Sequence, residues 1–128
     1  MCSPNPSPGS PRILSISRDA MLLASRNAVL RTAGYTIETA MRDDQAVERM
    51  RAGGIDAIVL GDSIEFVERN RLARDLKQIA PNVPILVIKT TGEDPPQEAA
   101  ASMDSLDGPE VLLQKLRQIL SSREAQAA

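Results

Sequence analysis

The sequence contains no histidine and no tryptophan, a single cysteine, and only two aromatic residues, Tyr35 and Phe66. Without histidine, the chain lacks the commonest general base and the commonest metal ligand. The one cysteine, Cys2, permits neither a disulfide nor a thiolate metal site within one chain. Aromatic platforms on which single-stranded nucleic acid could stack are also missing. These absences argue against a hydrolase or transferase that works through a nucleophile and a base.

Strong charge of one sign and long apolar runs are missing as well. The formal net charge of −2 gives no basic footprint for DNA or RNA. No apolar stretch approaches the ~20 residues of a membrane-spanning helix, and the amino-terminal stretch lacks the apolar core of a secretory signal. We therefore expect a protein of the reducing cytoplasm that binds neither nucleic acid nor membrane.

What is present is the composition of one globular domain. The chain has 128 residues, of which 42% are hydrophobic and 25% are charged. This length and balance suffice for a buried core, which must be aliphatic because aromatic residues are so few. We expect a flexible leader rich in proline and serine over residues 1–11, a folded domain over 12–121, and a frayed polar tail over 122–128.

Apolar patterning predicts strands that alternate with helices. The expected strands are Arg12–Ser17, Tyr35–Ala40, Ala57–Leu60 and Pro84–Ile88, with a fifth in the irregular stretch Ala99–Leu106, which could also begin as a short helix. The unbroken apolar run of the third strand suits a strand buried on both faces, as in a parallel sheet covered by helices. Short connections and right-handed crossovers then give a three-layer α/β sandwich with strand order 2-1-3-4-5.

The expected helices follow the strands. Asp19 is placed to cap the first helix, and Asp43 or Asp44 to cap the second, by accepting free amide hydrogens. The third helix is expected over Glu65–Ala80, with its basic side chains on a solvated face. Those side chains are Arg69, Arg71, Arg74 and Lys77. In such sheets function lies just beyond the carboxyl ends of the central strands, here at Gly61 and Asp62.

Two segments carry a resemblance to a known family: AVLRTAGYTIETAMRDDQAVERMRAGGIDAIVLGD, over Ala28–Asp62, and the carboxy-terminal GPEVLLQKL. An Ala-Gly-Tyr ahead of the second strand, an alanine that closes it, and an aspartate before the third strand are placed as in receiver domains. From about Arg12 to Leu120 the sequence resembles a CheY-like receiver domain of a two-component response regulator. The resemblance implies a flavodoxin-like fold, a doubly wound five-stranded parallel sheet.

The resemblance also implies a phosphoryl-transfer site, whose chemistry requires a cation and donors around an anionic group. Such receivers carry an acceptor aspartate after strand three, an acidic metal-binding pair after strand one, a hydroxyl after strand four and a lysine after strand five. Carried over by position, the acidic pair falls on Ser17 and Arg18, the acceptor on Gly61, the hydroxyl on Lys89 and the lysine on Ser105. The set is missing, which indicates a degenerate pseudo-receiver. Arg18 would place positive charge where a divalent cation should lie.

Two carboxylates stand one residue away from the implied positions. Asp62 follows the acceptor position, and Asp19 follows the acidic pair. A shift of one residue along a strand turns a side chain to the opposite face, although a bulge at Gly61 could return Asp62 to the site. The sequence thus leaves open a phosphorelay receiver with Asp62 as displaced acceptor and Asp19 as magnesium ligand. The simpler interpretation is a helix cap at Asp19 and a solvated loop residue at Asp62.

The region of a receiver's fourth helix is short in this sequence. Only fifteen residues separate Lys89 from Ser105, and Gly92, Pro95 and Pro96 disfavour helix in the first half. We expect this helix to be shortened or missing. In receivers the surrounding surface transmits activation and often forms dimers, so the usual output surface is not expected here.

We interpret the chain as a stand-alone, non-catalytic signalling module that binds another signalling protein, a histidine kinase or a downstream effector. We expect a cation-lined hollow at the end of the third strand, with Arg18 and Lys89 pairing with Asp19 or Asp62. No cofactor is expected, and magnesium is needed only if Asp62 is the acceptor. A homodimer is left open. A third hypothesis is a small anion- or nucleotide-binding module built on Arg18, Lys89, Thr90 and Thr91, which is weak because no long helix starts there.

Overall fold

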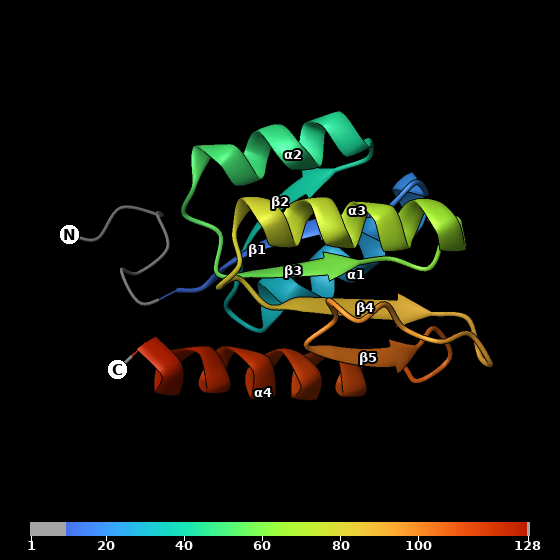
Figure 1. Cartoon of the computed structure of the whole chain (residues 1–128). Coiled ribbons are helices and arrows are strands. Elements are labelled where there is room, and N and C mark those ends of the chain that lie inside the picture. The colour runs from blue at the N-terminus through green and yellow to red at the C-terminus, as the bar shows by residue number, and fades with distance from the viewer. Residues whose placement is uncertain (1–9, 128) are drawn as a thin grey trace.

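The computed structural model describes residues 10–127, with side chains as far as Ser122. Its strands are β1 (Arg12–Ile16), β2 (Thr36–Ala40), β3 (Ala57–Leu60), β4 (Ile85–Lys89) and β5 (Ala101–Asp104). Its helices are α1 (Ala20–Thr32), α2 (Asp43–Ala52), α3 (Phe66–Ile79) and α4 (Pro109–Ala127). Strand and helix alternate along the chain except between β4 and β5, as Figure 1 shows.

The five strands form one parallel sheet in the order β2-β1-β3-β4-β5. This confirms the predicted doubly wound, flavodoxin-like order. Every residue of β3 is buried, because helices cover both of its faces. The parallel direction brings the carboxyl ends of all strands to one edge, which is called the carboxyl edge below.

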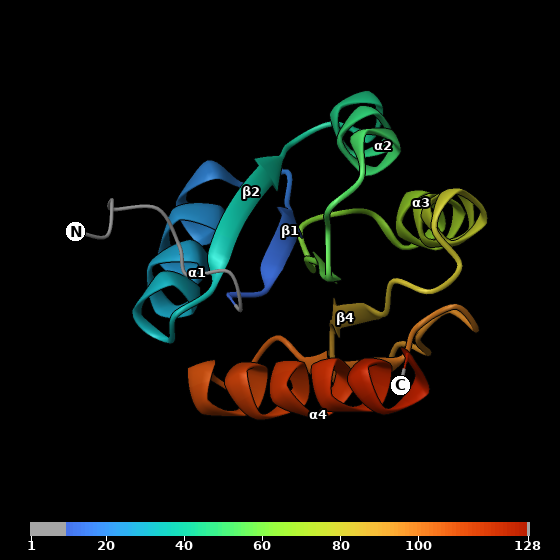
Figure 2. The same cartoon turned by 90° about the vertical axis from the view of Figure 1, so that its left-hand side faces the viewer.

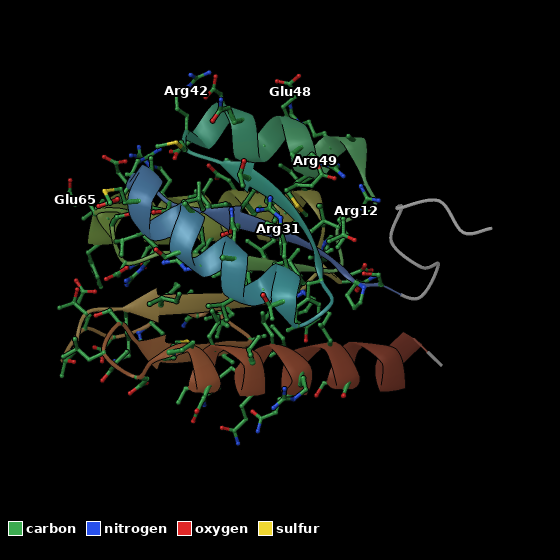
Figure 3. All side chains as sticks on the ribbon, turned by 180° about the vertical axis from the view of Figure 1, so that it is seen from behind. Arg12, Arg31, Arg42, Glu48, Arg49 and Glu65 are labelled. Atoms are coloured by element: carbon green, nitrogen blue, oxygen red, sulfur yellow. The ribbon has the colours of Figure 1, made fainter. Side chains whose placement is uncertain are left out.

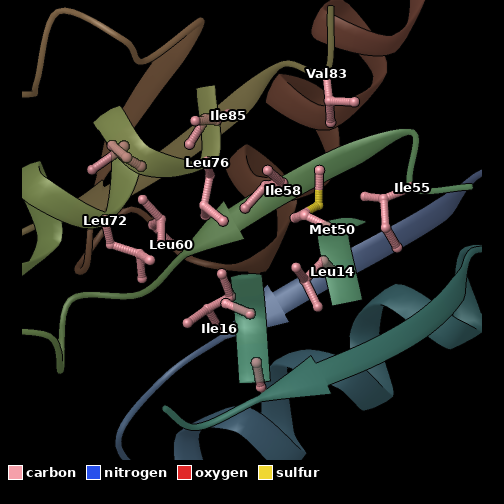
Figure 4. Close-up of a cluster of buried hydrophobic side chains, with 14 of the residues drawn as sticks. Leu14, Ile16, Met50, Ile55, Ile58, Leu60, Leu72, Leu76, Val83 and Ile85 are labelled. Atoms are coloured by element: carbon pink, nitrogen blue, oxygen red, sulfur yellow. The ribbon is translucent and has the colours of Figure 1, made fainter. Parts of the chain in front are cut away.

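Helices cover both faces of the sheet (Figure 2), and an aliphatic cluster lies on each face. One lies under α2 and α3 and includes Leu14, Leu60 and Leu76 (Figure 4). The other lies under α1 and α4 and includes Val59 and Leu116. Alternate residues of each strand supply the two clusters, so a short strand such as β3 contributes to both.

No helix lies between β4 and β5 in the described chain, so the predicted loss of the fourth receiver helix is confirmed. Met103 of β5 packs into the cluster under α1 and α4, which turns the polar Ser102 and Asp104 toward the opposite face. That face of β5 therefore has little apolar surface to cover. Instead of a helix, the loop packs Ala99 against the cluster that includes Leu14 and Leu60, and Pro96 of the same loop is buried.

Several element boundaries differ from the sequence-based expectation. Ser10 and Pro11, expected in the leader, are joined to the sheet: Ser10 Oγ donates to the carbonyl of Gly34, and Thr36 N donates to the carbonyl of Pro11. The rest of the expected leader lies outside the described residues. The expected frayed tail is helical as far as Ala127, because SSREAQA contains no helix breaker and is rich in good helix formers.

The start of α2 also differs from the prediction. The helix begins at Asp43, so Arg42, rather than either aspartate, occupies the capping position. The side-chain oxygen of Gln45 accepts hydrogen bonds from the amides of Met41 and Arg42. Asp43 and Asp44 lie in the first turn, where carboxylates favour the positive end of the helix dipole. Within residues 10–127, no helix is both long and apolar enough to cross a membrane.

Candidate functional site

The carboxyl edge brings the five implied site positions to the ends of β1, β3, β4 and β5. Ser17 and Gly61 each continue a strand by one residue, since Ser17 N donates to Ala40 O and Gly61 N donates to Ile16 O. Lys89 ends β4, and Ser105 follows β5, with Ser105 N donating to Lys89 O over 2.8 Å. The fold therefore assembles the edge that a receiver site would occupy, with different side chains.

At the acceptor position, the guanidinium of Arg26 lies against Gly61. A Cβ atom added to buried Gly61 would lie 2.9 Å from Nη1 of Arg26, 3.2 Å from its Nη2 and 3.0 Å from the carbonyl oxygen of Ile16. The Arg26 side chain, which comes from α1, is only 8% exposed. The expected hollow is therefore wrong at this point: an arginine fills the space that an acceptor side chain would need.

Sequence reasoning missed Arg26, although the helical period contained a signal. Arg26 comes three residues after Leu23 and four before Leu30, and both leucines are buried. Residues at this spacing share one face of a helix. Arg26 therefore had to lie on the inner stripe of α1, where a long cationic side chain must find a place within the fold.

The buried Arg26 cation is weakly compensated. Its Nη1 atom is fully buried and has no hydrogen-bond partner in the described structure. Its Nη2 atom lies 3.8 Å from Oδ1 of Asp62, which is an ion pair but too long for a hydrogen bond. Burial lowers the pKa of Arg26, and the nearby Asp62 carboxylate opposes that shift. Asp62, expected to be a solvated loop residue, has a side chain that is 24% exposed.

Arg18 binds carboxylates from the starts of two helices. Its Nη2 atom lies 2.6 Å from Oδ1 of Asp43 in α2 and 2.8 Å from Oε2 of Glu68 in α3, and its Nη1 donates to Met41 O. Burial alone would lower the pKa of Arg18, but the hydrogen bonds that Arg18 donates to Glu68 and Asp43 outweigh it and raise that pKa. The expected pairing of Arg18 with Asp19 or Asp62 is wrong, because the helix starts lie within its reach.

Two serine hydroxyls join the loops after β1 and β3. The Oγ atoms of Ser17 and Ser63 are 2.7 Å apart, and the Arg18 amide donates to Ser63 Oγ. Ser17 is fully buried, and its hydroxyl also accepts from the amide of Asp19. Asp19 caps α1 as predicted, since its Oδ1 accepts from the amides of Met21 and Leu22.

The residues at this edge do not fit a divalent cation. A serine and an arginine stand at the positions of the acidic pair, and the Asp19 carboxylate accepts helix amides. Magnesium prefers carboxylate and carbonyl oxygens in octahedral array, and an adjacent guanidinium would repel it. Among residues 10–127, no group of three acidic or cysteine side chains is arranged to hold a metal ion.

Lys89 and Ser105 have separate surroundings. Lys89 Nζ lies 2.7 Å from Oδ1 of Asp104, its partner in the β4–β5 register. The hydrogen bond from Lys89 lowers the pKa of Asp104. Lys89 therefore pairs with Asp104, and the expectation that it pairs with Asp19 or Asp62 is wrong. Ser105 is exposed and lines a cavity between α1 and α4. With Arg18 and Lys89 both facing carboxylates, the geometry does not favour the anion site expected at those two cations.

Arg69 corrects another expectation. It was expected on a solvated face, yet its side chain is 1% exposed. Its Nη1 lies 3.1 Å from Oε1 of Glu93 in the β4–β5 loop, and its guanidinium stacks 5.2 Å from the ring centroid of Phe66. Arg71 and Arg74 are exposed, as expected. This ion pair between buried Arg69 and part-exposed Glu93 ties α3 to the loop that replaces the missing helix.

A second ion-pair network lies away from the site, where Arg12 and Arg49 approach β2 (Figure 3). Arg12 Nη1 lies 2.7 Å from Oε2 of Glu38, and Arg49 binds both oxygens of the same carboxylate through its Nε and Nη2. The hydrogen bonds from Arg49 and Arg12 outweigh burial and lower the pKa of Glu38 to about 2. The network fastens edge strand β2 to β1 and α2.

Known proteins match this chain in structure, whereas searches with its sequence found no match. No protein-family model matches the sequence, and a search of curated proteins found no match. Solved structures do match. A CheY-like response regulator receiver domain protein from Methanospirillum hungatei has a TM-score of 0.81 at 18% identity, over 92% of this chain and 99% of the other.

Two further structures agree. The signal receiver domain of an HD domain-containing protein from Pseudomonas fluorescens has a TM-score of 0.82 at 16% identity, over 99% of this chain and 96% of the other. The N-terminal domain of a response regulator/sensory box/GGDEF 3-domain protein from Carboxydothermus hydrogenoformans has a TM-score of 0.80 at 21% identity, over 91% and 99%. The fold of this chain is that of the CheY-like receiver domains, as the resemblance in sequence implied.

Proposed function

We propose that this chain is a pseudo-receiver: a non-catalytic module of two-component-type signal transduction that binds another signalling protein without aspartyl phosphorylation. The observation that carries the proposal is the Arg26 guanidinium against Gly61, within 2.9 Å of where an acceptor Cβ would stand. Phosphoryl transfer needs a nucleophile, a cation and free donors around the transferred group. Here glycine stands at the acceptor position, and the nearby cations Arg18 and Lys89 are paired with carboxylates.

Exposed apolar side chains at the carboxyl edge support a role in protein binding. They lie in the loops or first helical turns that come after the strands: Met21 and Leu22 are near the start of α1, Met41 follows β2, Phe66 and Val67 start α3, and Leu106 is in the loop after β5. Met21 is 82% exposed and Leu106 is 87% exposed. Large apolar side chains gathered at one edge are typical of contact surfaces. We expect the partner to be a histidine kinase or a downstream effector in the cytoplasm, and a homodimer is an alternative use of the same surface.

The test is chemical phosphorylation followed by intact-mass measurement. The parent chain and Asp62→Asn are incubated with acetyl phosphate and magnesium, beside an ordinary receiver domain as positive control. We expect no phosphate adduct on either form of this chain while the control is modified. An adduct on the parent that disappears in Asp62→Asn would instead establish a phosphorelay receiver with a displaced acceptor.

A further inference from the structure

A cavity lies between the first turns of α4 and the inner face of α1, next to the carboxyl edge. Figure 2 shows α4 running beneath α1, and the cavity has a volume of about 340 Å³. Small-molecule pockets usually measure about 300–1,000 Å³, so this one suits a small ligand. Its position differs from that of the anion site considered at Arg18 and Lys89.

The cavity is lined by both apolar and polar side chains. The apolar lining comes from four elements, α1, β4, β5 and α4, which supply Val29, Ile88, Met103 and Leu112 respectively. The polar lining is formed by Ser25, Arg26, Asp62 and Ser105. An apolar pocket with a few converging polar groups is the usual form of a small-molecule site, in which the polar groups fix the ligand's orientation.

The buried positive charge of Arg26 at the cavity favours a ligand of negative charge. Its side chain is 92% buried, since 8% is exposed, and its Nη1 atom has no hydrogen-bond partner in the described structure. A buried cation normally requires close, hydrogen-bonded compensation. Its ion-pair partner among the described residues is Asp62, whose Oδ1 lies 3.8 Å from Nη2, too far for a hydrogen bond. The start of α4, at Gly108 and Pro109, also lines the cavity and adds the positive end of a helix dipole.

We propose that this cavity binds a small amphipathic anion, a carboxylate on an apolar body, with the carboxylate held by Arg26 and the body packed between α1 and α4. Arg26 lines the cavity, and its guanidinium donors other than Nη1, which is buried against Gly61, are the ones a ligand carboxylate would use. The ligand carboxylate would meet the guanidinium from the cavity side and compete with Asp62 for it. The proposal goes beyond protein binding and does not depend on it.

The experiment titrates the full chain, labelled with ¹⁵N, with octanoate as the probe. Octan-1-ol tests the apolar body alone, and inorganic phosphate tests a free anion alone. We expect saturable shifts with octanoate, concentrated on amides of α1 near Arg26 and on Ser105 and Gly108, and much weaker effects with the other two probes. Equal binding of octanol and octanoate, no saturable binding of octanoate, or shifts centred away from the cavity would overturn the proposal.

Charge variants test the role of Arg26. Arg26→Met should weaken octanoate binding by about tenfold or more, the range for losing a hydrogen bond to a charged group. Arg31→Met, on the exposed side of the same helix, is the control and should bind as the parent does. Asp62→Asn should bind octanoate more tightly, because it removes the competing carboxylate. Unchanged affinity in both Arg26→Met and Asp62→Asn would overturn the proposal; if Arg26→Met does not fold, Asp62→Asn and the mapped shifts decide it.

Discussion

Adding a single methyl group at Gly61 should destabilise the fold through Arg26. The backbone of Gly61 is outside the left-handed region, so alanine meets no conformational strain there. Its Cβ would, however, lie 2.9 Å from Nη1 of Arg26 and 3.0 Å from the carbonyl oxygen of Ile16. Overpacking of this kind costs about 1–3 kcal/mol. Alanine also reduces the conformational entropy of the unfolded chain, which stabilises the fold by about 0.4–1 kcal/mol. We therefore expect Gly61→Ala to lower the free energy of unfolding by about 1–2 kcal/mol.

The same substitution should cost far less once Arg26 is shortened. In an Arg26→Ala background, only the 3.0 Å contact with the Ile16 carbonyl remains, so Gly61→Ala should lower the free energy of unfolding by at least about 1 kcal/mol less than it does beside Arg26. Urea denaturation of the four proteins gives the coupling free energy, expected at about 1–2 kcal/mol. Arg31→Ala, from the exposed side of α1, serves as the matched background and should show no coupling. Costs that add within about 0.5 kcal/mol in the Arg26 background would refute the placement of Arg26 against Gly61.

Three further predictions concern stability, each measured by urea denaturation. In the folded protein Glu38 has a pKa of about 2, below its ordinary value of 4.5. Its contribution to the free energy of unfolding is therefore complete above pH 4.5 and disappears as the pH falls toward 2. Glu38→Gln should therefore cost about 1–2 kcal/mol at neutral pH, after solvent screening is allowed for, and nothing near pH 2; a pH-independent cost would contradict this. Glu93→Gln should lower the free energy of unfolding by about 1–2 kcal/mol, because it leaves the buried Arg69 cation without its carboxylate. Arg69→Met leaves only a part-exposed carboxylate and should lower it by less. A larger loss in Arg69→Met than in Glu93→Gln would contradict this role of the ion pair. Asp19→Ala should cost about 1 kcal/mol by removing the cap of α1, and a neutral result would contradict that role.

The sheet and its order could be predicted from the sequence because the signals were local. The unbroken apolar run of β3 and the short connections between strands and helices leave little choice of topology. The loss of the helix between β4 and β5 followed from Gly92, Pro95 and Pro96, which disfavour helix whatever surrounds them. The cap at Asp19 was equally local.

The contacts of the charged side chains could not be predicted in the same way, because they depend on tertiary distances. Arg18 reaches Asp43 and Glu68, residues 25 and 50 positions away in the chain. Arg69 looked solvated because acidic residues are interleaved with the basic ones on α3. Its burial depends on the β4–β5 loop, which brings Glu93 over it. The alternation of strand residues does explain why Lys89 meets Asp104, but only once the β4–β5 register is known.

The central claim is that the carboxyl edge holds neither a divalent cation nor a phosphoryl group. The most direct measurement is the ¹⁵N–¹H spectrum of the labelled chain, recorded first with increasing magnesium and then after addition of acetyl phosphate. We predict that the amides of Ser17, Gly61 and Asp62 keep their positions through both steps. A saturable shift of these amides with magnesium, or a second set of their resonances after acetyl phosphate, would contradict the account.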